Sequence, residues 1–167
     1  MTVIAFLGLG NMGGPMAANL VNAGYSVRGF DPVPAARQAA ADKNVAVVDS
    51  PADAVSGAEA VITMLPNGTL VKECYGDVIP VAAPGTLFID SSTISVDDAR
   101  EVHDYAGQRG MRQLDAPVSG GIKGATYPQW KCCRLYGMAK QAHPKAKAAQ
   151  KTRPPSPPSR GVLECAR

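Results

Sequence analysis

The chain has 167 residues, of which 46% are hydrophobic and 19% are charged. This apolar content is sufficient for a packed core, and the length is typical of one domain. No stretch reaches the ~18 apolar residues of a membrane-spanning helix, and no basic segment precedes the first apolar run as in a signal peptide. We therefore expect a cytoplasmic protein without a membrane partner.

The four cysteines do not indicate a metal site. Cys74, Cys132, Cys133 and Cys165 match no zinc-binding spacing, and the two adjacent cysteines are poorly placed to hold one ion together. We therefore expect free thiols, and we assign no metal ligands in this chain.

The first stretch, residues 2–13, predicts the feature around which the fold is organised. Val3–Leu7 is an apolar run of strand length and is rich in branched side chains, as in a buried parallel strand. Gly8, Gly10 and Gly13 follow in the spacing G-x-G-x-x-G. In a dinucleotide site the first glycine permits a tight turn, the second lets the backbone approach a pyrophosphate, and the third lets a helix pack on the strand. A glycine-rich turn without such a function is the alternative.

The residues that follow the glycines favour the dinucleotide site. Apolar side chains at helical spacing predict a helix that Gly24 ends, and residues 27–30 read as a second strand. Asp31 closes that strand, near the ~20-residue spacing at which an acidic side chain binds the ribose hydroxyls of adenosine. Unpaired amides at the helix N-terminus would attract the diphosphate.

Helices and strands alternate through the rest of the chain up to residue 125. The predicted helices span residues 35–42, 51–55, 69–75 and 96–109, and the predicted strands span residues 45–48, 60–65, 87–90 and 111–114. With the first two strands, this pattern indicates a Rossmann-type α/β fold, a doubly wound parallel sheet of strand order 3-2-1-4-5-6. Ligands bind beyond the carboxyl ends of such strands, so the loop 66–68 should border the cofactor, unless its Pro-Asn-Gly sequence is a simple turn.

Three segments resemble the β-hydroxyacid dehydrogenase family. Residues 6–16 read FLGLGNMGGPM, residues 64–67 read MLPN, and residues 90–94 and 115–121 read DSSTI and DAPVSGG. They look like the family's N-terminal signature, its second cofactor loop, and its nicotinamide and substrate segments. Within the family the resemblance is to the 3-hydroxyisobutyrate dehydrogenases of valine breakdown, and it implies oxidation of a 3-hydroxy acid to its semialdehyde with hydride transfer to NAD.

The resemblance also implies a role for each matching position. The glycine loop would hold the pyrophosphate, Asp31 the adenosine ribose, the second loop the cofactor, and Thr93 would lie near the nicotinamide. The implied cofactor-binding residues are Gly8, Leu9, Gly10, Asn11, Met12, Gly13, Asp31, Leu65, Pro66 and Thr93. The implied ligands of the substrate carboxylate are Ser119, Gly120 and Gly121, whose hydroxyl and amides suit an anion. Without the resemblance, that last segment reads as a flexible turn.

Asp31 also bears on the choice between NAD and NADP. A carboxylate there accepts hydrogen bonds from a ribose diol and repels a 2′-phosphate. The next residue is Pro32 rather than an arginine that could pair with phosphate. We therefore expect NAD in preference to NADP.

The resemblance stops near residue 125. The family continues into a helical domain that supplies its catalytic lysine and much of the contact within its homo-oligomers, and the matching segment is missing here. We therefore expect residues 1–125 to form a dinucleotide-binding domain in a truncated chain without the family's catalytic residue. Such a chain would bind NAD but would not turn over a small 3-hydroxy acid.

Residues 126–167 differ in character from the rest. They carry 9 Lys and Arg against one acidic residue, whereas residues 1–125 carry 8 against 13, and this asymmetry marks a boundary. Charge and proline content predict a disordered basic tail. The abrupt loss of resemblance also fits a shift of reading frame, and a genuine short protein with a basic tail is the alternative.

Two other functions fit parts of the sequence. A reductase of another small semialdehyde, such as tartronate semialdehyde, would keep the fold and change the substrate. A nucleic-acid-binding or adaptor protein would attract phosphates with the basic tail, although no aromatic platform or known binding module accompanies the charges. We therefore expect a small-molecule substrate rather than nucleic acid.

Overall fold

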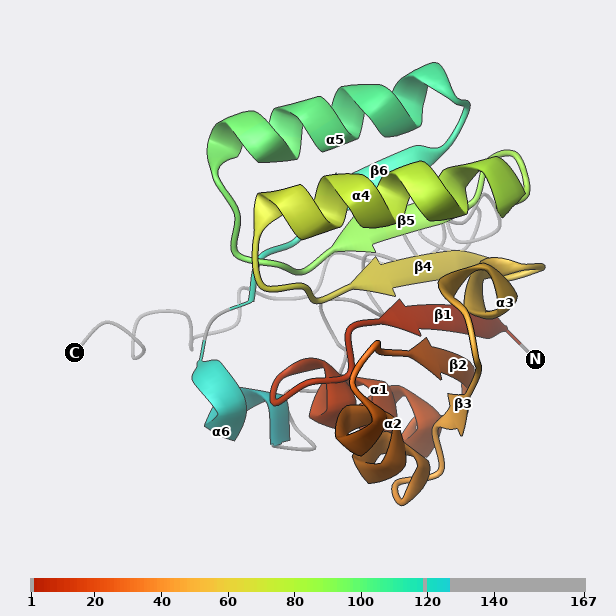
Figure 1. The fold of residues 1–167 in the computed structure, drawn as a ribbon, viewed down its shortest axis with the longest axis vertical. Coiled ribbons are helices and arrows are strands. Elements are labelled where there is room, and N and C mark those ends of the chain that lie inside the picture. Colours follow the sequence, from red (N-terminus) through yellow and green to blue (C-terminus); the bar gives the residue numbers. More distant parts are fainter. Residues whose placement is uncertain (1, 119, 127–167) are drawn as a thin grey trace, which may run out of the picture.

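Six parallel strands lie side by side in the computed structural model, which describes residues 2–118 and 120–126. Their order is β3-β2-β1-β4-β5-β6, so the winding of the chain reverses between β1 and β4 (Figure 1). The strands are β1 (Val3–Leu7), β2 (Ser26–Phe30), β3 (Ala46–Val47), β4 (Ala60–Thr63), β5 (Leu87–Asp90) and β6 (Arg112–Asp115). The predicted strand order is confirmed.

Helices connect the strands and complete the Rossmann-type α/β fold that the sequence predicts. They are α1 (Gly13–Asn22), α2 (Pro34–Ala41), α3 (Pro51–Val55), α4 (Gly68–Val78), α5 (Val96–Gln108) and α6 (Gly121–Thr126), with a 3-10 turn η1 (Ile79–Val81) after α4. The side chains of Ser50, Asn67 and Ser95 cap α3, α4 and α5 by accepting a hydrogen bond from a first-turn amide. Among the residues that the structure describes, no helix combines the length and the apolarity that crossing a bilayer requires.

The central strand β1 is buried on both of its faces. Ile4 and Phe6 belong to a core packed by α1, α2 and α6, whereas Ala5 and Leu7 belong to a core packed by α3, α4 and α5. Side chains of a strand alternate between its faces, so one apolar run supplies both cores. The predicted buried parallel strand is therefore confirmed.

The strand β4 is shorter than the sequence predicts. Its expected span reached residue 65, but it ends at Thr63. The Leu65 amide donates to Ser92 Oγ at 2.9 Å instead of to a neighbouring strand, and Pro66 has no amide to donate. The chain therefore leaves the sheet two residues early, and α4 begins at Gly68, where Asn67 caps it.

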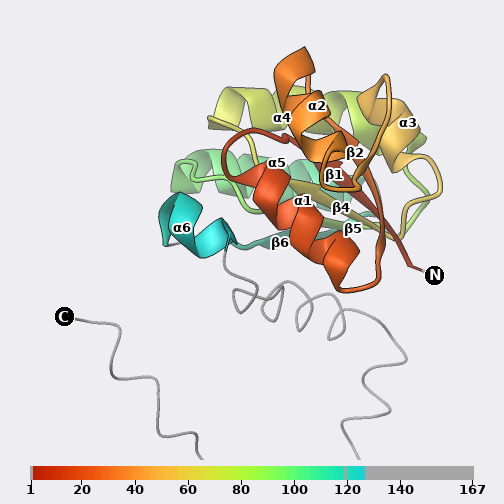
Figure 2. The ribbon, with the colours of Figure 1, turned by 90° about the horizontal axis from the view of Figure 1, so that it is seen from below.

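The short helix α6 is missing from the sequence-based prediction, which assigns no helix or strand after residue 114. The helix packs on α1: Ala125 is fully buried, and Asn19 Nδ2 donates to the Ala125 carbonyl at 2.8 Å. Figure 2 shows the two helices beside each other. Two of the six residues of α6 are glycines, which disfavour a helix locally. The helix α6 therefore depends on its contact with α1.

Part of the sequence-based prediction lies outside the described residues. This applies to Ser119, to residues 127–167 of the basic tail, and to three of the four cysteines. The expected boundary near residue 125 and the expected disorder of the tail stay predictions.

We expect Gly13→Ala to destabilise the fold. A Cβ at Gly13 would lie 1.8 Å from the Gly8 carbonyl oxygen, so α1 would have to move away from the end of β1. The loss should be about 3 kcal/mol or more of unfolding free energy, measured by urea denaturation. Gly107→Ala is the control, since a Cβ on this exposed face of α5 meets nothing within 4 Å. This substitution should raise the free energy of unfolding by about 1 kcal/mol. Equal denaturation midpoints for native protein and Gly13→Ala would contradict this packing argument.

Candidate functional site

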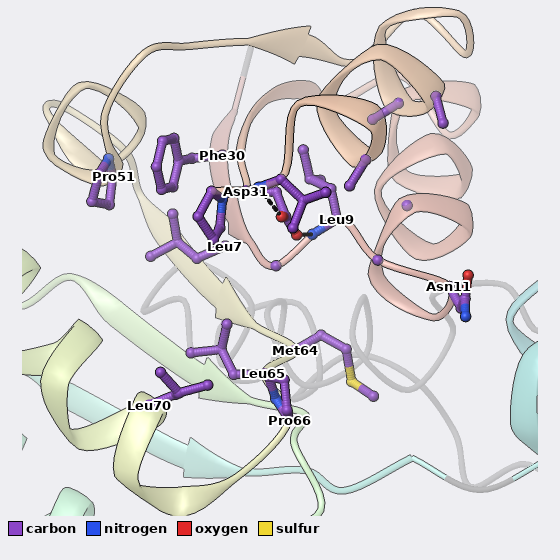
Figure 3. Close-up of a pocket in the computed structure, with 18 of the residues that line it drawn as sticks. Leu7, Leu9, Asn11, Phe30, Asp31, Pro51, Met64, Leu65, Pro66 and Leu70 are labelled. Carbon is purple, nitrogen blue, oxygen red and sulfur yellow. Dashed lines mark hydrogen bonds between the residues drawn. The ribbon is translucent and has the colours of Figure 1, made fainter.

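A cleft of about 1000 Å³ opens at the carboxyl ends of β1, β2 and β4. Its walls are the glycine loop with the start of α1, the end of β2 with α2, and residues 64–66 with α4 (Figure 3). The winding of the sheet reverses between β1 and β4, which is where ligands bind in open α/β sheets. The cleft therefore lies where the sequence places the dinucleotide.

The glycine loop is closely packed at one end and open at the other. Gly8 has φ +95°, and a Cβ there would lie 2.3 Å from the Met64 carbonyl oxygen. A Cβ at Gly10 would meet no atom within 4 Å, and Gly10 lines the cleft. The first glycine is thus required by the protein's own backbone, whereas the space at the second is free for a ligand to approach.

The N-terminus of α1 provides amides for an anion. No side chain caps this helix at Met12, in contrast to α3, α4 and α5. The Gly14 amide donates to the Gly10 carbonyl at 3.0 Å, and the amides before it belong to the first turn, which has no acceptor within the helix. The helix dipole adds partial positive charge at this end. The arrangement suits the diphosphate of a dinucleotide.

Asp31 joins the glycine loop to the end of β2. Its Oδ2 accepts from the Leu9 amide at 2.7 Å, and its Oδ1 accepts from the Val33 amide at 2.8 Å (Figure 3). The residue is only 7% exposed, yet it lines the cleft. A carboxylate has about four acceptor positions, so two remain for ribose hydroxyls. The family resemblance implies that the Leu9 backbone helps to hold the pyrophosphate, but in the structure the Leu9 amide donates to Asp31.

A buried polar network joins the ends of β4 and β5. Asp90 Oδ1 accepts from Thr63 Oγ1 at 2.8 Å and from the Ser92 amide at 3.0 Å. Ser92 Oγ in turn accepts from the Leu65 amide at 2.9 Å. Burial raises the pKa of Asp90, against the opposing effect of the hydrogen bonds from Ser92 and Thr63. The carboxyl end of β5 is thereby connected to the wall of the cleft.

The structure brings most of the predicted site residues together. Those that line the cleft are Gly8, Leu9, Gly10, Asn11, Asp31, Leu65 and Pro66. Those outside its lining are Met12 and Gly13 at the start of α1, and the exposed Thr93, Gly120 and Gly121 beyond β5 and β6. Ser119 is outside the described residues. The roles of all these residues in binding stay predictions.

The far end of the cleft was not expected from the sequence. Phe30 of β2, Pro51 of α3, and Leu70 and Cys74 of α4 contribute to its lining there. Burial, with the nearby Asp77 and Asp90 charges, raises the pKa of the Cys74 thiol to about 12, so this thiol stays protonated at neutral pH. A largely apolar slot of this kind suits a nucleobase. Only the folded topology brings these three elements together, because no motif or periodicity links Phe30, Pro51 and Leu70.

Comparisons with known proteins agree with this geometry. The family described as the NAD binding domain of 6-phosphogluconate dehydrogenase matches residues 3–147. The chain is 66% identical over 125 residues to the probable 3-hydroxyisobutyrate dehydrogenase of Mycobacterium tuberculosis, covering 75% of this chain and 42% of that protein. It is 46% identical over 128 residues to the NAD-dependent L-serine dehydrogenase of Pseudomonas aeruginosa, covering 75% and 43%.

A solved structure is similar over the same part of the chain. The Mycobacterium tuberculosis 3-hydroxyisobutyrate dehydrogenase with L-serine has a TM-score of 0.75 at 66% identity, covering 75% of this chain and 43% of that chain. The chain thus spans less than half the length of these relatives. The family match extends past residue 125, where the sequence predicts the domain boundary.

We expect Asp90→Asn to change how stability depends on pH. Because burial raises the pKa of Asp90, the folded state holds this proton more tightly than the unfolded chain does. The native protein should therefore lose stability relative to Asp90→Asn as the pH rises from the ordinary aspartate pKa of 3.8 through the folded value. Urea denaturation at a series of pH values measures this difference.

The control for this pH experiment is Asp98→Asn. Hydrogen bonds from Lys72 and Ser95 lower the pKa of Asp98, so this carboxylate contributes stability that is lost as the pH falls. The two variants should therefore differ from the native protein with opposite slopes. Parallel curves for native protein and Asp90→Asn would show that burial does not disfavour the Asp90 charge.

Proposed function

Because this chain belongs to the family of the NAD binding domain of 6-phosphogluconate dehydrogenase, we propose that its cleft binds NAD and forms the cofactor site of an oxidoreductase of 3-hydroxy acids. The observation that carries the proposal is the combination at one cleft of an open Gly10, an uncapped α1 and a carboxylate at the end of β2. The open Gly10 and the uncapped α1 fit the diphosphate of a dinucleotide, and the carboxylate fits its ribose hydroxyls.

Different residues of the cleft would bind different parts of the cofactor. The amides of Asn11, Met12 and Gly13 would hold the diphosphate, and the remaining acceptor positions of Asp31 would bind the ribose hydroxyls. Leu65 and Pro66 would pack against the cofactor from the opposite wall. Bound NAD would supply the acceptor for a hydride from the substrate carbon. The chain's own residues contribute binding and orientation, which hold the cofactor in one pose.

The proposed substrate is a small 3-hydroxy carboxylate. The relatives carry the names of 3-hydroxyisobutyrate and L-serine dehydrogenases, and both compounds have a hydroxyl on carbon 3, where the carboxyl carbon is carbon 1. L-serine is therefore the second candidate substrate. The Ser119–Gly121 segment would bind the common carboxylate. A cytoplasmic location belongs to the same proposal, as does homo-oligomeric assembly of the full-length family members. NADH formation in excess NAD, measured with each acid for a full-length counterpart, would rank the two substrates, whereas this chain alone should bind NAD without turnover.

We expect Gly10→Val to abolish most NADH binding without unfolding the protein. The added side chain meets no protein atom within 4 Å at its Cβ, but it occupies the space through which a pyrophosphate would reach the loop. Fluorescence titration with NADH should show affinity at least about tenfold weaker, a loss of about 1.4 kcal/mol. Gly107→Val makes the same substitution on an exposed face of α5 and should bind as the native protein does. Equal NADH affinity in folded Gly10→Val would remove the cofactor from this loop.

We expect Asp31→Ala to weaken NAD binding and to narrow the preference for NAD over NADP. The variant loses hydrogen bonds to the ribose, about 1.5–3 kcal/mol for each bond to a charged group, together with the repulsion of a 2′-phosphate. It also removes the acceptor of the Leu9 amide, so stability should fall by about 1–3 kcal/mol. Calorimetry with both cofactors measures the ratio of dissociation constants, in which any loss of folded protein cancels. A native chain that binds NADP more tightly than NAD would refute the assignment of Asp31.

A further inference from the structure

We infer that Ser92 is a positioning residue for the cofactor, because its hydroxyl, held in place through Asp90, fixes the wall of the cleft formed by Leu65 and Pro66. The inference rests on the proposed function, since it assigns to the end of β5 a part in shaping the NAD site. Neither Ser92 nor Asp90 lines the cleft, so the effect passes through the backbone of residue 65.

The first step is the attachment of Ser92 to β4. Thr63 and Asp90 are opposite each other in the register of β4 and β5, and each is the last residue of its strand. One carboxylate oxygen of Asp90 accepts from both Thr63 Oγ1 and the Ser92 amide. The backbone of Ser92 is therefore fixed relative to β4, although it lies beyond the end of β5.

The second step is the contact from Ser92 to the cleft wall. The Leu65 amide is the first to leave the sheet after β4, and it donates to Ser92 Oγ at 2.9 Å. Ser92 is 1% exposed, so water has little access to replace its hydroxyl as the acceptor. Pro66 has no amide, and Asn67 already belongs to the cap of α4. The Met64 amide before this segment donates to the Leu7 carbonyl, and the cap of α4 follows it. Ser92 is thus the acceptor that holds residues 65 and 66 in place.

The third step is the contact of this wall with the glycine loop. Met64 and Leu65 pack directly on Gly8: a Cβ there would lie 2.3 Å from the Met64 carbonyl oxygen and 3.0 Å from Leu65 Cδ2. Figure 3 shows Met64, Leu65 and Pro66 across the cleft from Leu9 and Asp31. A shift of residue 65 would therefore change the width of the cleft and the support of the glycine turn together.

The neighbouring Ser91 offers a matched control. Its side chain is also fully buried, but its Oγ has no hydrogen-bond partner among the residues that the structure describes. Ser91→Ala and Ser92→Ala therefore remove the same atom from adjacent buried positions, and only the second removes an acceptor. Ser92→Thr keeps the hydroxyl and serves as the conservative variant.

The test compares these three variants with the native full chain in two measurements. The first is the dissociation constant of NADH from fluorescence titration. The second, made without cofactor, is hydrogen–deuterium exchange of the amides in residues 64–70. We expect Ser92→Ala to bind NADH about five- to tenfold more weakly and to exchange at least about fivefold faster in this segment, because a buried amide loses its acceptor. Ser91→Ala should match the native protein in both measurements, and Ser92→Thr should restore at least half of the loss.

The outcomes separate this inference from the proposed function. If the native chain binds no NADH, the proposed function is wrong, and exchange in residues 64–70 still decides whether Ser92 holds the segment. If the native chain binds NADH but Ser92→Ala exchanges no faster in this segment than Ser91→Ala does, the positioning role is wrong. The role is also wrong if Ser92→Ala speeds exchange equally throughout the chain, which would indicate general destabilisation.

Discussion

The burial of β1 on both faces is the constraint on which the rest of the structure depends. Its register sets Leu7 opposite Phe30 of β2 and opposite Thr63 of β4, so the three strands end at one level. The next residues continue this arrangement, since the Gly8 amide donates to the Phe30 carbonyl and the Met64 amide donates to the Leu7 carbonyl, each at 2.9 Å. The glycine loop, the Asp31 carboxylate and the second loop meet at one edge because two apolar cores hold a five-residue strand between them.

Much of the fold could be predicted because its signals are local. Apolar runs, glycines and capping serines mark where β1, α3 and α5 begin or end, and the alternation of helices and strands implies the order of the sheet. The end of β4 and the helix α6 could not be predicted in this way. Leu65 leaves the sheet for a serine 27 residues later in the chain, and α6 depends on a contact of Ala125 with Asn19 that its own glycines do not favour.

The candidate site likewise has parts with a local sequence signal and parts that depend on contacts between distant residues. A motif with fixed spacing identifies the glycine loop and Asp31, because adjacent strands bring neighbouring loops to one edge. Spacing cannot reveal that the Leu9 amide is already occupied by Asp31, or that Asp90 and Ser92 support the opposite wall. Nor can it reveal the apolar end of the cleft, where Phe30, Pro51 and Leu70 come from different elements. Such contacts follow from the packed structure rather than from any one segment.

The two hydrogen bonds that Asp31 accepts from the backbone also affect the thermodynamics of binding. They hold the glycine loop and the start of the segment after β2 in one conformation before any ligand arrives. A ligand that enters this cleft meets a preorganised loop, so its association does not carry the entropy cost of ordering these residues. The Asp31 carboxylate therefore lowers the entropy cost of binding through the two hydrogen bonds that it already accepts, and its other lone pairs can still accept from a ligand.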